Sequence, residues 1–144
     1  MKSYTDEQVF LGTWGEIWFD GDYMAEVKKF RSEVEISYED VPQCRKLGKG
    51  KKMTGYEGKG EVGFLKVSSY VTERVSAALK AGKVPSFTII SKLADPNAIG
   101  AERIACYNCK FEKLTLADWE RDKVGEENYS FFFSEWELLD TASE

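Results

Sequence analysis

The chain contains no histidine among its 144 residues. This absence excludes histidine-dependent catalytic triads, cysteine–histidine pairs, HExxH zinc sites and imidazole acid–base chemistry. Cysteine is scarce, and an odd set of three cysteines argues against a disulfide framework and for a reducing compartment. No apolar run approaches the roughly 20 residues that a membrane helix requires. The N-terminal residues form no apolar stretch of the kind found in signal peptides, so we expect no secretion signal.

What the chain does contain is typical of one globular domain. Hydrophobic residues make up 42% and charged residues 31%, a composition that can bury a core and does not indicate disorder. Aromatic residues reach 14%, and aromatic side chains favour strands. We therefore expect a single domain over residues 1–144, with an N-terminal arm at 1–10 and a polar tail at 139–144.

Charge is unevenly distributed along the chain. The net charge is −5, which does not favour general attraction to nucleic acid or to an anionic membrane. Residues 44–66 nevertheless carry a net charge of +5, between −6 over residues 1–43 and −4 over residues 67–144. A basic segment inside an acidic body predicts contact with an acidic surface, although a solvated lysine-rich loop would have the same composition.

Alternation of polar and apolar residues predicts the first strands. A strand through Trp14–Phe19 is followed by Asp20-Gly21, a favoured two-residue hairpin turn. The return strand alternates from Phe30 to Tyr38, and a slip in the pattern after Val27 indicates a β-bulge. Residues 39–53 are rich in lysine and glycine and are predicted to form a long mobile loop.

The rest of the chain is predicted to add one helix and further strands. A glycine-containing strand at 56–67 precedes a helix that Ser68 or Ser69 can cap and that Gly82 can end. The remaining strands are expected at 86–93, 102–114 and 129–138. The predicted fold class is therefore α+β, mainly β: an antiparallel β-sandwich or barrel with one flanking α-helix and a long charged loop.

Two of the predicted strands are apolar on both faces. Trp14 and Trp18 share one face of the first strand, and Phe131 and Phe133 share one face of the last. A sheet in a small sandwich normally keeps one face in water, so these strands need cover on both sides. Either the helix or the arm supplies that cover, or a second subunit does, since interfaces are enriched in aromatic residues. These four side chains are the candidates for a subunit interface.

Candidate catalytic and metal-binding patterns are weak. Cys106 and Cys109 form a CxxC pattern, but an alternating strand would point them to opposite faces. A redox site would need a helix N-terminus, and zinc would need further ligands. Two carboxylates on one strand face, Glu33 with Glu35 or Glu135 with Glu137, could form a glycosidase-like pair. For this hydrolase hypothesis a solvated strand face is the simpler interpretation. We therefore predict no catalytic residue, no metal and no cofactor.

Three stretches of the chain, taken in order, carry a family resemblance. The first is Gly15–Lys28, which contains the hairpin turn. The second joins Lys51–Gly55 to Gly60–Ser68, and the third joins Pro85–Ile90 to Gly100–Ile104. In this order and spacing they resemble the tail tube proteins of contractile-tailed phages, in the group that includes PBSX-like defective prophages and the R-type bacteriocins of Gram-positive bacteria.

The resemblance implies a structural subunit without catalytic residues. Six subunits would form a ring, and rings would stack into a hollow tube inside a contractile sheath. In phages such a tube surrounds the DNA path, and in bacteriocins it pierces a membrane. The implied partners are further copies of the chain, sheath and baseplate proteins, and DNA that passes without specific binding, with no membrane anchor. Assembly would take place in the cytoplasm of the host bacterium, before the protein becomes part of a virion tail or a bacteriocin particle.

Within such a tube, an alternating strand would present Arg31, Glu33 and Glu35 to the lumen while Val34 and Ile36 face the core. The basic loop would meet the acidic body of the next ring through Arg45, Lys46, Lys49, Lys51 and Lys52. The alternative hypothesis is a small monomeric β-barrel that binds an apolar ligand, which the aromatic content favours.

Overall fold

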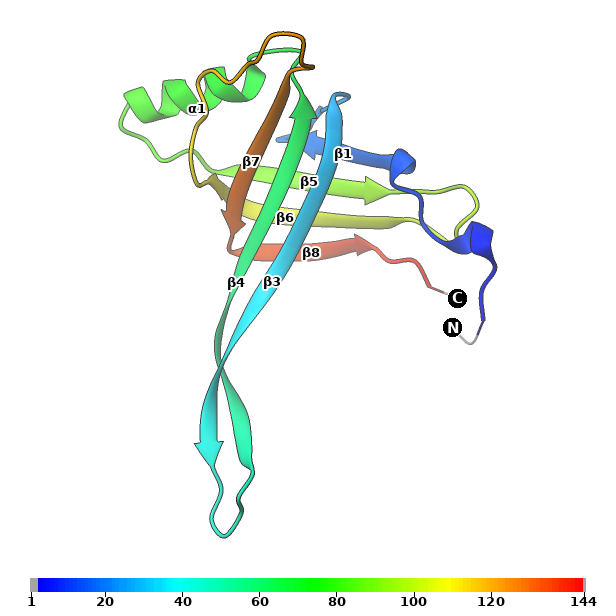
Figure 1. The fold of residues 1–144 in the computed structure, drawn as a ribbon, viewed down its shortest axis with the longest axis vertical. Helices are drawn as coiled ribbons and strands as arrows, with labels where there is room; N and C mark the ends of the chain where they lie inside the picture. Colours follow the sequence, from blue (N-terminus) through cyan, green and yellow to red (C-terminus); the bar gives the residue numbers. More distant parts are fainter. Residues whose placement is uncertain (1–2, 144) are drawn as a thin grey trace.

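The computed structural model describes residues 3–143, which form a β-sandwich with one α-helix (Figure 1). Eight strands make one antiparallel sheet that folds back on itself into two layers, and the strands of the two layers cross steeply in Figure 1. This confirms the predicted α+β, mainly β class. The elements are β1 (Gly15–Phe19), β2 (Asp22–Tyr23), β3 (Val27–Pro42), β4 (Lys49–Leu65), α1 (Tyr70–Lys80), β5 (Phe87–Leu93), β6 (Glu102–Phe111), β7 (Glu126–Phe133) and β8 (Glu135–Asp140), preceded by short 3-10 helices at Asp6–Gln8 and Gly12–Trp14.

Strand β6 belongs to both layers. One layer has the order β2-β1-β5-β6-β8, and the other contains β3, β4 and β7. The end of β6 also pairs with β7, through Lys110 and Phe111. The sequence predicted one strand over 129–138, but the chain bends at Ser134, whose Oγ accepts a hydrogen bond from Asn108 Nδ2 at 3.0 Å. The bend lets one stretch of chain serve both layers, so the sandwich closes along β6.

Aromatic side chains fill the space between the layers. Phe19, Phe64 and Phe131 are each at most 2% exposed, and burial of such rings is the main favourable contribution to folding. Phe133 lies in the same core, and its ring centroid is 6.2 Å from that of Phe131. The sequence assigned Phe131 and Phe133 to a subunit interface. That expectation is wrong for the folded subunit, because the second layer of the same chain already covers both rings.

The helix α1 forms where the sequence predicts it. Val71 and Val75 on one face are buried in the core, and Gly82 follows the helix with a φ of 73°, a left-handed conformation that favours glycine. Arg74 on the neighbouring face donates a hydrogen bond to Asp20 Oδ2 at 2.8 Å. The helix is therefore tied to the turn between β1 and β2 as well as to the core.

Strand β4 passes directly against the aromatic rings of β7. A Cβ atom at Gly60 would lie 2.4 Å from the Phe131 ring and 2.6 Å from the carbonyl oxygen of Arg31. A Cβ atom at Gly58 would lie 2.4 Å from the Phe133 ring. Glycines inside a predicted strand indicate close backbone approach, and the structure confirms that interpretation at these two positions.

Cys106 and Cys109 both point into the core, which corrects the expectation that they face opposite ways. A register shift between Phe87 and Ile89 leaves an extra residue in β6, and Asn108 there has a φ of 55°. The resulting bulge returns residues three apart to the same face. Both cysteines are 0% exposed and free. Burial raises the pKa of both thiols, that of Cys109 to about 12.

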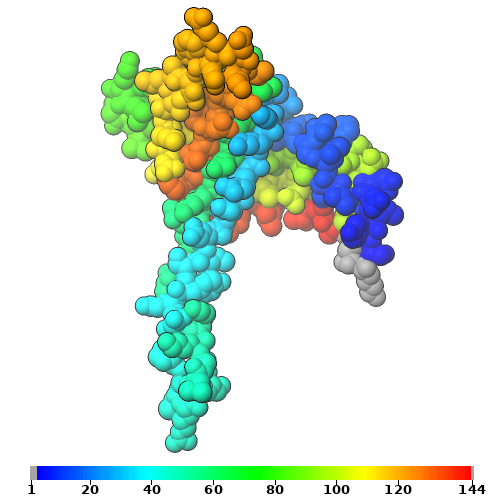
Figure 2. Space-filling view, in the orientation of Figure 1, coloured from blue at the N-terminus to red at the C-terminus, as the bar shows by residue number. Residues whose placement is uncertain are grey.

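The segment 39–53 departs most from the sequence prediction. Strands β3 and β4 stay paired to their ends, so only residues 43–48 form the turn of a long hairpin. Oppositely charged residues face each other across the two strands, as in the ion pair between Asp40 and Lys51. Such cross-strand pairs stabilise strand pairing in a sequence whose charge density resembles that of a loop. Figure 2 shows the hairpin projecting far from the body.

Candidate assembly surfaces

The outer face of β3 carries the charged residues that the sequence assigned to a lumen. Arg31, Glu33 and Glu35 are exposed, and they alternate with the half-buried Ser32 and Val34. Opposite them on β4, in register, stand Glu61, Lys59 and Glu57. The prediction that the three β3 residues share one outward face is confirmed, and their assignment to a lumen remains a prediction. Ile36 was expected in the core, but it is 45% exposed.

Two cations of this outer face lie beside carboxylates. Arg31 Nη2 is 3.5 Å from Glu61 Oε1, and Lys59 Nζ donates to Glu35 Oε2 at 2.8 Å. That hydrogen bond and the lysine charge lower the pKa of Glu35, and the same bond with the surrounding carboxylate charges raises the pKa of Lys59. A glycosidase acid needs a raised pKa, so this face does not favour the hydrolase hypothesis for Glu33 and Glu35.

The five cations assigned to contacts between rings all lie on the exposed hairpin formed by residues 38–53. Lys51 forms an ion pair with Asp40, and Lys52 stands opposite Glu39 in the strand register. Apart from Lys51, the cations of the set have no carboxylate of residues 3–143 within 4 Å; these are Arg45, Lys46, Lys49 and Lys52. The structure therefore places Lys51 in an ion pair within the hairpin, sets Lys52 opposite Glu39, and presents Arg45, Lys46 and Lys49 to solvent near the turn.

The two tryptophans proposed for an interface lie outside the core. Trp14 belongs to the 3-10 turn before β1 and is 45% exposed, so the strand begins one residue later than predicted. Trp18 lies half-buried on the outer face of β1, where its ring centroid is 5.4 Å from that of Tyr23. Both tryptophans remain interface candidates.

The loop between β6 and β7, residues 112–125, carries three exposed apolar side chains that the sequence analysis missed. Leu116, Trp119 and Val124 are 73%, 77% and 78% exposed. The sequence signal that could have found this surface is three large apolar residues within a highly charged stretch. Trp119 and Val124 line one groove together, and exposed apolar side chains that gather in this way can mark an interaction site.

Aromatic rings fill the centre of the sandwich. The ring of Phe111 lies 5.4 Å from that of Phe87 and 5.2 Å from that of Tyr129, between the centroids. No group of three or more His, Cys, Asp or Glu side chains within residues 3–143 is arranged to hold a metal ion. Within the same residues, the helix is too short and too polar to cross a membrane. A pocket of about 360 Å³ nevertheless opens between the layers beside Ile17, Val27 and Phe30, so the β-barrel alternative stays a hypothesis.

Comparisons with known proteins identify one family and one shared fold. A family model described as "Phage tail tube protein" matches residues 2–140. The phage-like element PBSX protein XkdM of Bacillus subtilis (strain 168) is 30% identical over 140 residues, covering 96% of this chain and 95% of the relative. The tube-terminating cap of the anti-feeding prophage has a TM-score of 0.75 at 6% identity over 97% of both chains. A chain of the sheath–tube complex of a PVC extracellular contractile injection system in its extended state has a TM-score of 0.67 at 8% identity, over 96% of this chain and 100% of that one. At such low identities, the two structures establish a shared fold.

Proposed function

The chain belongs to the phage tail tube protein family, and on that premise we propose that it is a subunit of a hollow tube built from stacked six-membered rings. Members of this family are structural components of phage or phage-like particles, not enzymes. The tube lies inside a contractile sheath and serves as a conduit for DNA or for membrane piercing. Sheath and baseplate proteins are its proposed partners besides further copies of the chain.

The observation that carries this proposal is the hairpin at 38–53. It extends along the longest axis of the molecule, away from the body (Figure 1). Its backbone pairs with itself, and its ion pair between Lys51 and Asp40 also stays inside it. A two-stranded ribbon alone is only marginally stable in water. Contact with a subunit of the neighbouring ring would order and cover this ribbon.

Ring closure has its own candidate surfaces. Strand β3 is an edge strand that pairs only with β4 among the described residues. Such an edge presents unpaired N–H and C=O groups, which natural proteins otherwise protect. We assign this edge, together with Trp14 and Trp18, to contacts between neighbouring subunits of one ring.

The outer face of β3 and β4 is the proposed lining of the lumen. DNA must slide through such a channel without sticking, and free cations would bind its phosphates with release of counterions. Here Arg31 and Lys59 lie beside Glu61 and Glu35. The paired cations support a surface that does not retain DNA.

Electron microscopy and sedimentation of the purified full-length chain test the proposal. Closed rings form by mass action, so monomers should give way to rings and then to stacks as the protein concentration rises. A monomer at every concentration, with no growth when sheath or baseplate proteins are added, overturns the proposal. Compact monomers that bind an apolar dye would support the β-barrel alternative instead.

A further inference from the structure

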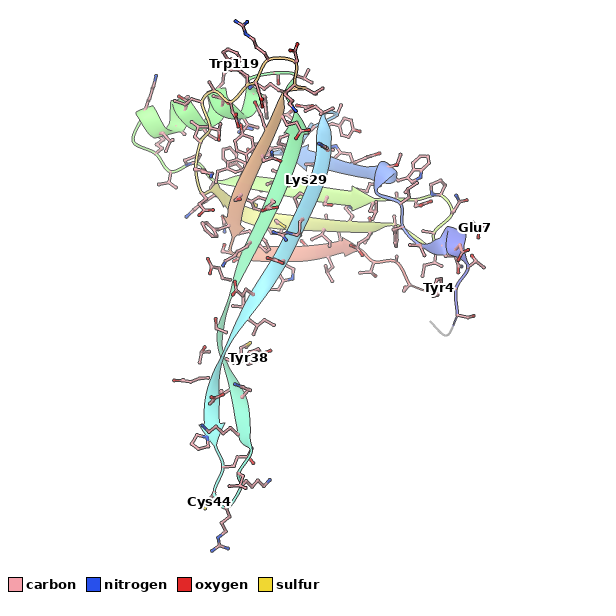
Figure 3. All side chains as sticks on the ribbon, in the orientation of Figure 1. Tyr4, Glu7, Lys29, Tyr38, Cys44 and Trp119 are labelled. Carbon is pink, nitrogen blue, oxygen red and sulfur yellow. The ribbon has the colours of Figure 1, made fainter. Side chains whose placement is uncertain are left out.

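The hairpin tip and the 112–125 loop lie at opposite ends of the molecule. Figure 3 labels Cys44, in the turn of the hairpin, at one end of the longest axis and Trp119, in the loop, at the other. The two surfaces therefore cannot meet within one subunit. In a stack of subunits that all point the same way, the tip of one copy approaches the opposite end of another.

The 112–125 loop is anchored at both ends, yet its apolar side chains stay outside. The backbone N–H of Glu112 donates to the carbonyl of Ser130 at 3.0 Å, and the N–H of Lys66 donates to the carbonyl of Gly125 at 2.8 Å. Irregular loops of this length in compact domains are usually functional. An anchored loop that presents Trp119 to solvent is a preformed surface, which loses little conformational entropy when it binds.

A groove of about 450 Å³ beside this loop can receive an apolar tip that carries cations. Trp119 and Val124 contribute apolar lining, and three carboxylates line the groove against one lysine. For two of these carboxylates, Asp118 and Glu120, no cation of residues 3–143 lies within 4 Å. The groove is therefore more polar than apolar, with Trp119 and Val124 as its apolar lining and an excess of carboxylates over lysine.

The hairpin tip has the complementary chemistry. Leu47 is fully exposed, with a relative accessibility of 105%. Arg45, Lys46 and Lys49 surround it in sequence, and none of the three has a carboxylate of residues 3–143 within 4 Å. A leucine among cations matches a groove that holds Trp119 and Val124 among an excess of carboxylates.

We propose that the hairpin tip of one copy docks on the 112–125 loop of the next copy in the stack, with Leu47 in the groove beside Trp119 and the tip cations facing Asp118 and Glu120. This inference rests on the proposed tube function and names the contact that joins its rings. Burial of the leucine supplies affinity, and the opposite charges orient the approach.

The exposed thiol of Cys44 at the tip provides a direct test. In the variant Leu116→Cys, a short bis-maleimide should link Cys44 of one copy to the loop of the next and give a ladder of multimers from assembled full-length protein. The matched control is Leu79→Cys, at an exposed position on α1 (53% accessible), which should give no ladder. Absence of a ladder from assembled Leu116→Cys, or an equal ladder from the control, counts against the docking.

A pair of blocking variants tests the same contact without a cross-link. Leu47→Asp blocks the tip and Trp119→Asp blocks the groove, and both replace exposed side chains, so unfolding curves should match the wild type. Each variant alone should form rings that do not stack, whereas a mixture of the two ring types should form two-ring particles and no long tubes.

The remaining outcomes separate this inference from the proposed function. Tubes of normal length from Trp119→Asp overturn the docking while leaving the tube function intact. The same tubes with weakened sheath binding would assign the loop to the sheath and also overturn the docking. A wild-type chain that forms no rings or tubes overturns the proposed function itself.

Discussion

At the scale of single residues, Gly60 marks the closest approach of β4 to its neighbours. In Gly60→Ala the new methyl group would collide with the ring of Phe131 and with the backbone of Arg31. Overpacking of this kind costs about 1–3 kcal/mol of unfolding free energy, which urea unfolding measures. The control is Gly55→Ala on the same strand, where the new methyl group would have no neighbouring atom within 4 Å. Equal losses in the two variants would contradict the packing argument.

The buried hydroxyl of Tyr129 makes the fold sensitive to alkaline pH. Burial raises the pKa of Tyr129 to about 12, above its value of about 10 in an unfolded chain. As pH rises, the unfolded state therefore loses this proton before the folded state does. The stabilisation of the fold by the neutral hydroxyl is complete below pH 10 and is lost as pH rises from 10 to 12. The free energy of unfolding, measured with urea, should decline less steeply over that pH range in Tyr129→Phe than in the wild type. Identical declines would rule out Tyr129 as the cause, while Cys109, whose pKa is also raised, accounts for a remaining slope.

The three cysteines should differ in reactivity. Cys44 is exposed at the hairpin tip, whereas Cys106 and Cys109 are buried as thiols of raised pKa, and the thiolate is the reactive form. A thiol reagent should modify one cysteine in the native protein and all three after unfolding.

Chelator and reductant should leave the melting temperature unchanged, because the three cysteines are free and residues 3–143 hold no metal-binding group. A drop of many degrees on chelation would contradict this assignment.

Sequence alternation predicts residue orientation only where the strand is regular. It correctly placed Arg31, Glu33 and Glu35 on one outward face, because β3 has no bulge between them. It failed at Cys109, where one extra residue in β6 inverts the parity. Alternation could not predict the burial of Phe131, because this strand is apolar on both faces. The face that becomes buried is decided by the second layer, which forms from distant parts of the chain.

At the scale of elements, the hairpin shows the limit of reading loops from composition. Alternation is clear to Tyr38 and then gives way to charges and glycines, which are typical of a loop. Pairing continues because acidic residues of β3 stand opposite lysines of β4, information that becomes visible only when the two strands are aligned. The helix was easier to predict, since its buried face and its terminal glycine are local signals.

Hydrogen exchange should reveal how assembly changes this element. The outer hairpin, residues 38–53, has water on both faces, so its amides should exchange rapidly in the isolated subunit. Contact with a neighbouring ring should slow that exchange. Amides of residues 58–64 serve as the control, because β4 lies there between β3 and β7 and is already protected. Equal protection of the hairpin before and after assembly would show that stacking does not involve it.

At the scale of the whole molecule, the charge distribution predicts how tube length responds to salt and to charge reversal. Arg45→Glu combined with Lys46→Glu should shorten tubes while leaving ring formation intact, and high salt should act in the same direction because exposed charges are screened. Electron microscopy measures both effects. Lys51→Glu is the contrasting variant, since it places a glutamate beside Asp40 and weakens the hairpin itself. Tubes of normal length from the double variant would contradict this prediction and show that the tip cations are only solvated charges.

The family, unlike the details of the loops, was predictable from the sequence. The order of hairpin turn, glycine-rich strand, helix and later strands spans most of the chain, and the family match over residues 2–140 confirms that resemblance. The sequence could not predict the proposed contact between the hairpin of one copy and the 112–125 loop of the next. Their residues lie about 70 positions apart, and only the fold places them at opposite ends of the molecule.

That placement gives any stack of these subunits a polarity. A stack in which every hairpin points the same way ends in a fringe of basic hairpins at one terminus and in uncovered loops at the other. The two termini then differ chemically, so elongation at each must proceed at its own rate. A protein that starts such a tube must imitate one of these surfaces, and a protein that stops it must imitate the other.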